Sequence, residues 1–543
     1  MTDTAARPHA FRRLRRGAAA AVAVAGLVAL AACTSDPTSA SGGTGSASDT
    51  LSVYLYQKPK VFSPLATANG PDQIVMSLVF DSLLAPDQDF TLQPHLAAAL
   101  PTLSADSTTY TFKLRPGLKW SDGKPFTSKD VLFTYNLLAN PASGSATSGN
   151  YATVEGYDAV KAGTAKTLTG FSAPDDNTFV IRSSKPNAGL TATIGSVPIL
   201  PEHVLGNVPL DRLDTHPFFN QPTVGLGPYT FKTYKTDQYV ELTANRAYRS
   251  KVNIGTILLK PLTSDVATAQ LGTGELDIAQ VLPVDAPTVQ KMSGVSVEGK
   301  DSAGFVRIAV NQAKPMFKDA RVRQAFLYAV DRQKLVDKVL AGKGKVINSA
   351  IDPEAAGLQP YAYDPAKARA LLQAAGWKSG TTVTLAWVPG QRDRDTSAAI
   401  VQSQLKDVGV NVVLKQVEAA QLVDSYKSHS FDMVLYGGGN YAVDPFQTFT
   451  ILACSQAFPN GGNIPPFCNP QLDSLLTQAN GLADPAARKV LYDKAAVIEN
   501  QSAAYLWLYS PQILWAHRSR VKGFVPSGDF TAPFLDVATW SLR

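Results

Sequence analysis

The stretch YTFKLRPGLKWSDGKPFTSKDVLFT, residues 110–134, carries the strongest structural signals in the chain. Its first six residues alternate apolar and polar side chains, which predicts a half-buried strand. Turns follow at Gly117 and Gly123. Thr127, with Asp130 three residues later, predicts a capping box at the start of a helix. The stretch therefore predicts a strand, two turns and a helix in direct succession.

Similar helix signals recur in the second half of the chain. Three helices are predicted from capping residues, apolar periodicity and terminal glycines, at about Asp319–Gly342, Asp364–Gly376 and Ile400–Gly409. Strands are predicted at Val383–Trp387 and Val410–Leu414. Helices that alternate with strands favour α/β lobes over a sandwich or a helical bundle.

The first 50 residues are predicted to be an export signal and a tether. Five arginines precede an uncharged stretch of 16 residues, 17–32, which is typical of a signal peptide at residues 1–32. The ending Leu-Ala-Ala-Cys33 resembles the lipobox of bacterial lipoprotein precursors, in which the cysteine carries the lipid. Two alternatives to a lipoprotein signal are an ordinary signal peptide and an uncleaved membrane anchor. The sequence is compatible with export by either the Sec or the twin-arginine route. Residues 33–50 follow as a Ser/Thr/Gly-rich flexible tether.

The positive charge of the chain belongs mostly to this leader. Lys and Arg number 50 against 44 Asp and Glu, a net charge of +6. Without residues 1–32 the net charge falls to +2. Because no basic cluster with interleaved aromatic residues remains, we expect no nucleic-acid partner.

Signals for catalysis or for a cofactor are few. The six histidines are scattered, and three cysteines are too few for a four-cysteine zinc site. We therefore expect no metal, no cofactor and no enzymatic activity. Ser121 and Lys124 fit an S-x-x-K motif, which leaves a lipid-anchored serine acyl hydrolase as a distant alternative.

Residues 110–134 resemble the extracellular solute-binding protein family 5, the dipeptide-, oligopeptide- and nickel-binding components of ABC importers. Further motifs of the family follow in the family's order and cover nearly all of residues 51–525. They include Pro94-x-Leu96-Ala97, Gly225-x-Gly227-Pro228-Tyr229, Gly274-Glu275-Leu276-Asp277, Asp319-x-Arg321-Val322-Arg323, Ala374-Ala375-Gly376-Trp377 and Asn469-Pro470-x-Leu472-Asp473.

The resemblance implies a two-lobed periplasmic-binding-protein fold of type II-like, cluster C architecture, an α/β fold that closes about a hinge. Lobe I would carry an extra subdomain. By that layout we expect lobe I at residues 51–84, 213–298 and 505–543, the inserted subdomain at 85–212, and lobe II at 299–504.

The resemblance also implies a peptide site. A peptide presents a carboxylate and an ammonium group, and burying either without a partner is costly. In dipeptide-binding relatives, a Gln-Arg pair at the position of Gln391-Arg392 supplies the arginine that binds the ligand carboxylate. Arg394 lies where relatives tend to have an aromatic residue. The alternative is a surface loop with two solvated arginines.

The ammonium side of that site departs from the family pattern. Relatives place an amine-binding Asp shortly before an Asp-Pro pair, whereas this chain has only Asp444 of the pair itself, which could instead cap a turn. Tyr436, Tyr441 and Trp387 are the candidates for lining the pocket.

Relatives carry a disulfide in this region, which implies a bond between Cys454 and Cys468, with two free thiols as the alternative. The implied function is a lipid-anchored, monomeric peptide-binding protein that delivers its ligand to the transmembrane and ATPase subunits of an ABC importer at the outer face of the membrane. An oligosaccharide, an opine or chelated nickel remains an alternative ligand.

Overall fold

The structure is a computed structural model that describes residues 49–66, 70–438, 443–529 and 531–543. The expectations for the signal peptide, for Cys33 and for Tyr441 lie outside these residues. Within the described ranges, no helix is long and apolar enough to span a membrane.

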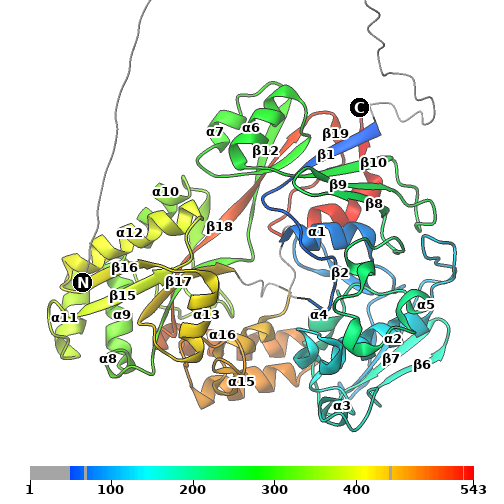
Figure 1. Cartoon of the computed structure of the whole chain (residues 1–543). Coiled ribbons are helices and arrows are strands. Elements are labelled where there is room, and N and C mark those ends of the chain that lie inside the picture. The colour runs from blue at the N-terminus through cyan, green and yellow to red at the C-terminus, as the bar shows by residue number, and fades with distance from the viewer. Residues whose placement is uncertain (1–48, 67–69, 439–442, 530) are drawn as a thin grey trace, which may run out of the picture. The chain divides into compact units, whose positions relative to one another are not determined.

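The described chain is built on one large mixed sheet of 12 strands (Figure 1). Their order is β16-β15-β17-β13-β18-β11-β1-β10-β9-β8, and β12 and β14 also pair with β18. The strands are β1 Thr50–Leu55, β8 Tyr229–Lys235, β9 Tyr239–Ala244, β10 Thr256–Pro261, β11 Ile278–Val281, β12 Val295–Asp301, β13 Phe305–Val310, β14 Gly344–Val346, β15 Thr382–Trp387, β16 Asn411–Gln416, β17 Met433–Gly438 and β18 Tyr505–Arg518.

The long strand β18 belongs to both ends of this sheet. Its first residues, 505–509, pair with β13, and residues 512–518 pair with β12. We call β1, β8–β12 and the second part of β18 the lobe I half, and β13–β17 with the first part of β18 the lobe II half. The chain passes between the halves along β18 and along the segment that joins β12 to β13, residues 302–304 (Figure 1). The α/β fold class predicted from the helix–strand order is confirmed.

A separate antiparallel sheet contains the strand predicted at the start of residues 110–134. It has the order β4-β5-β7-β6, with β4 Thr102–Leu103, β5 Thr109–Lys113, β6 Phe171–Asp175 and β7 Thr178–Arg182. The helix α2 Ser128–Ala139 follows, and its predicted capping box is confirmed: Thr127 accepts from the helix backbone, and Asp130 accepts from the amide of Thr127. Gly117 and Gly123 adopt φ of 74° and 87°, which a glycine accommodates without strain.

The helices of the lobe II half correct one prediction. The single helix expected at Asp319–Gly342 is two helices, α9 Ala320–Ala329 and α10 Arg332–Val339. The break arises because Val330 is extended and Asp331 caps the second helix by accepting from the amide of Lys334. The helix α12 Arg392–Asp407 begins eight residues earlier than the expected start at Ile400.

The remaining helices frame the two halves. The main ones are α1 Gly70–Val79, α4 Leu190–Ile194, α6 Ser264–Thr273, α11 Pro365–Ala374, α13 Ala419–Lys427, α15 Pro470–Asn480 and α16 Pro485–Ser502. In α11, Asp364 caps the first turn as predicted. The lobe II half has a core on each face: Leu385 and Met433 point toward the side of α12, while Val434 points to the other side. Strand neighbours therefore point to opposite faces, as the strand period requires.

Candidate ligand-binding site

Tyr436, one of the predicted residues, lies near the carboxyl end of β17, and Arg394, another, lies next to Gly437 at the same strand end. Tyr436 pairs in register with Arg307 of β13, and the guanidinium carbon of Arg307 lies 4.6 Å from the ring centre of Tyr436. The same guanidinium lies 5.2 and 5.0 Å from the rings of Tyr505 and Trp507, and it donates to the carbonyl of Gly438 over 3.3 Å. Stacking on aromatic rings stabilises a desolvated cation, so this face of the sheet end carries a fixed positive charge.

Arg307 was missed by the sequence analysis. It is 4% exposed, although arginine is rarely buried. The available signal was one arginine inside the otherwise apolar strand FVRIAV, residues 305–310.

Arg394 approaches the same strand end from the other face. It lies in the first turn of α12, and a Cβ added to Gly437 would lie 2.6 Å from its Nη2 atom. A side chain at position 437 would force the Arg394 guanidinium to move, so the glycine leaves room for it. The Nε of Arg394 and the hydroxyl of Tyr436 are buried and make no hydrogen bond within the described residues. Two guanidiniums thus lie on opposite faces of the end of β17.

The other two residues predicted on β15 and α12 lie elsewhere. Arg392 is exposed at the start of α12. Trp387 is 4% exposed, and its indole N–H donates to Asp395 over 2.6 Å. Because β15 runs parallel to β17 with Leu385 opposite Met433, Trp387 faces the α12 core, whereas Tyr436 faces the opposite side. The structure therefore does not bring Trp387 and Tyr436 together.

Asp444 is engaged inside the lobe II half. Its carboxylate accepts from the amide of Phe446 and so caps the short helix η6 Pro445–Thr448. It also accepts from Arg488 over 2.7 Å and from the hydroxyl of Tyr492 over 3.2 Å. Asp444 is 6% exposed, and its charge is balanced by Arg488. The geometry supports the turn-capping interpretation more than a free carboxylate for an ammonium group.

A second buried carboxyl group lies behind the aromatic residues around Arg307. Glu499 of α16 is fully buried and accepts from the indole N–H of Trp507 over 2.8 Å and from the hydroxyl of Ser349. These donors are neutral, so burial dominates and raises the pKa of Glu499 to about 7.

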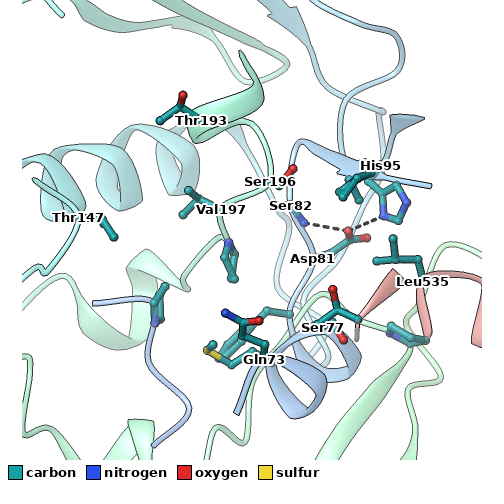
Figure 2. A pocket seen from close by; sticks show the side chains of 18 of the residues that line it. Gln73, Ser77, Asp81, Ser82, His95, Thr147, Thr193, Ser196, Val197 and Leu535 are labelled. Atoms are coloured by element: carbon teal, nitrogen blue, oxygen red, sulfur yellow. Dashed lines mark hydrogen bonds and ion pairs between the residues drawn. The ribbon is translucent and has the colours of Figure 1, made fainter. Parts of the chain in front are cut away.

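A pocket of about 480 Å³ lies on the lobe I side (Figure 2). Gln73, Met76 and Ser77 line it from α1 at the spacing of one helix face, and Phe80 lines it directly after the helix ends. Val197 lines it from the segment after α4, and Leu535 lines it from the short helix η8 Ala532–Thr539. This volume is within the range of small-molecule sites.

One edge of the pocket holds an ionised cluster. The Asp81 carboxylate accepts from the amide of Ser82 and lies 2.9 Å from Nδ1 of His95, as Figure 2 shows, and it also pairs with Arg249. Burial acts to raise the pKa of Asp81, but His95 and Arg249 together hold it below its usual range. The pocket therefore presents mostly apolar surface beside a neutralised charge.

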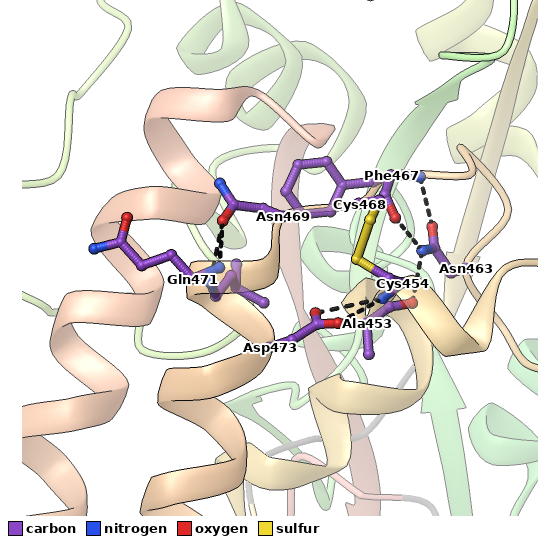
Figure 3. The surroundings of a disulfide bond; sticks show 9 residues. Ala453, Cys454, Asn463, Phe467, Cys468, Asn469, Gln471 and Asp473 are labelled. Atoms are coloured by element: carbon purple, nitrogen blue, oxygen red, sulfur yellow. Dashed lines mark hydrogen bonds between the residues drawn. A yellow bond between two sulfur atoms is a disulfide. The ribbon is translucent and has the colours of Figure 1, made fainter.

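The disulfide region lies after η6 in the lobe II half (Figure 3). The structure joins Cys454 to Cys468 with an S–S distance of 2.13 Å. The amide of Cys454 donates to the carboxylate of Asp473, and the side chain of Asn463 donates to the carbonyl groups of Ala453 and Phe467. The bond therefore lies in a region that polar contacts also hold together.

Comparisons with known proteins bear on the family and the fold. A family model described as bacterial extracellular solute-binding proteins, family 5 Middle, matches residues 91–460. Protein XP55 of Streptomyces lividans is 30% identical, over 88% of this chain and 86% of that protein. The oligopeptide-binding protein AppA of Bacillus subtilis is 27% identical, over 87% of this chain and 88% of that protein.

Two solved structures extend the comparison. The structure of AppA from Bacillus subtilis in complex with a nonapeptide matches with a TM-score of 0.77 and 25% identity, over 91% of this chain and 99% of that chain. The structure of NikZ from Campylobacter jejuni in complex with Ni(L-His) matches with the same TM-score, identity and coverage. The two-lobed fold class expected from the sequence is confirmed by these matches.

Proposed function

The chain belongs to the bacterial extracellular solute-binding proteins, family 5, and from this premise we propose that it is the substrate-binding component of an ABC importer that captures peptides. Members of this family are binding proteins and not enzymes. The serine hydrolase alternative is therefore set aside, and Ser121 has a structural contact instead: its hydroxyl accepts from the amide of Gly225 over 3.1 Å.

The observation that carries the proposal is the pair of guanidiniums at the end of β17. The Nε of Arg394 is buried and has no hydrogen-bond partner among the described residues. The hydroxyl of Tyr436 is also buried and also lacks such a partner there. A carboxylate is the group that a guanidinium binds best, because two parallel N–H donors match its two oxygens. We assign the ligand carboxylate to Arg394; Tyr436 lies on the opposite face of β17, beside Arg307.

The lobe I pocket supports a peptide more than a small inorganic ligand. Met76, Phe80 and Val197 supply apolar surface, and the Asp81 charge is already balanced. Such a pocket suits an apolar side chain of a peptide. The described residues contain no group of three or more His, Cys, Asp or Glu side chains that could hold a bare metal ion.

Capture would proceed by a shift between open and closed states. The two halves are linked by β18 and by residues 302–304, which are the natural positions for a hinge. A ligand that contacts both halves favours the closed state only by its difference in affinity for the two states. A dissociation constant in the micromolar range corresponds to about 8 kcal/mol.

The cellular setting is part of the proposal. A lipid on Cys33 would anchor the protein at the outer face of the cytoplasmic membrane, and residues 34–50 would let the folded body reach the permease. The lobe ranges 51–84, 213–298 and 505–543, with the subdomain 85–212 and lobe II 299–504, describe the proposed moving parts. We propose that the protein works as a monomer.

The disulfide can be tested by chemistry. If Cys454 and Cys468 are bonded, denatured protein should expose two more thiols after reduction than before. A closed loop of this size contributes about 3 kcal/mol on the chain-entropy model. Equal thiol counts with and without reductant would exclude the bond.

Native mass spectrometry of the full chain, purified gently from its host, tests the function. We expect added masses that match short peptides and that disappear after partial unfolding and dialysis. Retention of an opine, an oligosaccharide or a nickel chelate, with no exchange for added peptides, would replace the peptide assignment and leave the transport class intact.

A further inference from the structure

A polar contact joins the inserted subdomain, residues 85–212, to the lobe II half. The loop Asn187–Gly189, which follows β7, meets Asn480 at the end of α15. The amide of Gly189 donates to Oδ1 of Asn480 over 2.8 Å, and the amide of Ala188 donates to its carbonyl over 2.7 Å. The side-chain amide of Asn480 donates to Oδ1 of Asn187 over 2.9 Å. One asparagine therefore makes three hydrogen bonds to residues about 290 positions away.

This contact is closely packed. Asn187 and Asn480 are each 7% exposed. A Cβ on Gly189 would lie 3.1 Å from Oδ1 of Asn480 and 3.3 Å from Cδ1 of Phe446. The φ of Gly189 is −77°, so a glycine is favoured here by lack of space and not by backbone conformation.

The residues behind Asn480 connect this contact to the segment after β17. Arg488 donates from Nε to the carbonyl of Ala479 over 3.2 Å and from Nη2 to Asp444 over 2.7 Å. Asp444 caps η6, whose Phe446 packs against Gly189. The partly buried ion pair of Asp444 and Arg488 therefore supports Asn480 from one side and Phe446 from the other.

We propose that Asn480 and the loop Asn187–Gly189 form a latch that holds the inserted subdomain against lobe II in the closed state. The inference rests on the proposed function, because it assumes that the two lobes separate to admit ligand. Opening must break three buried hydrogen bonds and expose the amide of Asn480. The latch therefore stabilises the closed state whether or not ligand is present, and it slows ligand release.

The latch gives Asp444 a role that differs from the ligand role expected from the sequence. Its charge holds Arg488, and Arg488 holds the end of α15 where Asn480 projects. Asp444 and Arg488 are thus positioning residues for closure. A carboxylate in this place contributes to affinity through the latch and without touching the ligand.

Distance measurements between the lobes test the latch directly. Spin labels are placed at exposed positions of the full chain by Asp158→Cys and Lys378→Cys, with Cys33→Ser to prevent labelling there. Asn480→Ala should lower the closed-to-open ratio about tenfold, the effect of losing one to two net hydrogen bonds. Asn187→Ala should lower the ratio by less, and the double variant should not exceed Asn480→Ala, because both residues act in one contact.

Two matched controls separate the latch from general damage. Gln478→Ala changes an exposed side-chain amide on α15 that donates to Ser474 of the same helix, and it should leave the distances unchanged. Gly189→Ala should open the lobes by crowding Asn480, whereas Gly149→Ala, where a Cβ meets nothing within 4 Å, should not. Urea unfolding midpoints establish that each variant is folded.

The latch and the proposed function can fail separately. Distance distributions for Asn480→Ala and Gly189→Ala that superimpose on those of the unchanged chain would overturn the latch, even if peptides bind. A shift of the distances in ligand-free protein would support the latch even if the peptide mixture used as probe, an equimolar set of di- to pentapeptides, fails to bind.

Discussion

The lobe I half and the lobe II half each bury a carboxyl group, and the pKa values of the two groups shift in opposite directions. Asp81 in the lobe I half contacts His95 and Arg249, and these groups hold its pKa below the usual range. Glu499 in the lobe II half accepts hydrogen bonds from the neutral groups of Trp507 and Ser349, and burial raises its pKa to about 7 although the charge of Arg307 acts to lower it. Both carboxyl groups are buried, so the direct contacts of Asp81 with His95 and Arg249 account for the opposite directions of the two pKa shifts.

The same contrast extends to the surfaces next to these groups. In the lobe I half, the charges cancel beside an apolar pocket. In the lobe II half, the guanidiniums of Arg307 and Arg394 lie on both faces of one strand end. One half thus offers apolar contact and the other offers positive charge, which together suit a peptide with an apolar side chain and a carboxylate.

The largest effect is expected from breaking the lobe I ion cluster. Asp81→Ala would leave Arg249 and His95 partly buried without their carboxylate, which should cost about 3–5 kcal/mol in the free energy of unfolding. The control is Asp122→Ala. Asp122 pairs with His203 but is more exposed than Asp81, so its loss should cost at most about 1 kcal/mol in the free energy of unfolding. Equal losses in urea unfolding would show that burial of the pair does not matter.

The next largest effect is a pH dependence of the free energy of unfolding that arises from Glu499 in the lobe II half. Because the folded pKa of Glu499 lies near 7 and its ordinary value is 4.5, the folded state binds more protons than the unfolded state between these values. Stability should therefore fall by about 3 kcal/mol as pH rises from about 4.5 to 7.

The variant Glu499→Gln tests the assignment of this slope. The amide keeps an acceptor for the indole N–H of Trp507 but does not titrate, so the variant should lose this part of the pH dependence. An unchanged difference in unfolding free energy between pH 4.5 and 7 would assign the slope to other groups.

A smaller effect is expected for ligand affinity at Arg394. Arg394→Ala should weaken binding of peptides with a free carboxylate by about 10- to 100-fold, the range for a hydrogen bond to a charged group. The control Arg321→Ala removes an exposed arginine that pairs with Asp319 two residues away, and it should leave affinity unchanged. Titration calorimetry that shows equal affinities for both variants would remove Arg394 from the site.

Local signals made much of the fold predictable. The capping box of Thr127 and Asp130 and the cap at Asp364 depend on residues within one helical turn, and both were correct. The break between α9 and α10 was missed because the apolar periodicity continues through Val330, while the second cap at Asp331 interrupts the backbone.

The site was harder to predict because its contacts are non-local. The pairing of Asp444 with Arg488 spans 44 positions, and nothing in either neighbourhood indicates it. The separation of Trp387 from Tyr436 depends on the register between β15 and β17, and a shift of one residue would have put both on one face. Arg307 was overlooked because a single arginine in a strand is compatible with an exposed edge.

Small-angle scattering of the full chain with defined peptides tests the central claim most directly, namely that two lobes close on a peptide through its carboxylate. The equimolar di- to pentapeptide mixture should reduce the radius of gyration, and the same peptides with amidated carboxyl ends should reduce it less. An unchanged radius of gyration with both mixtures, under conditions where the protein is folded and free of retained ligand, would contradict the account.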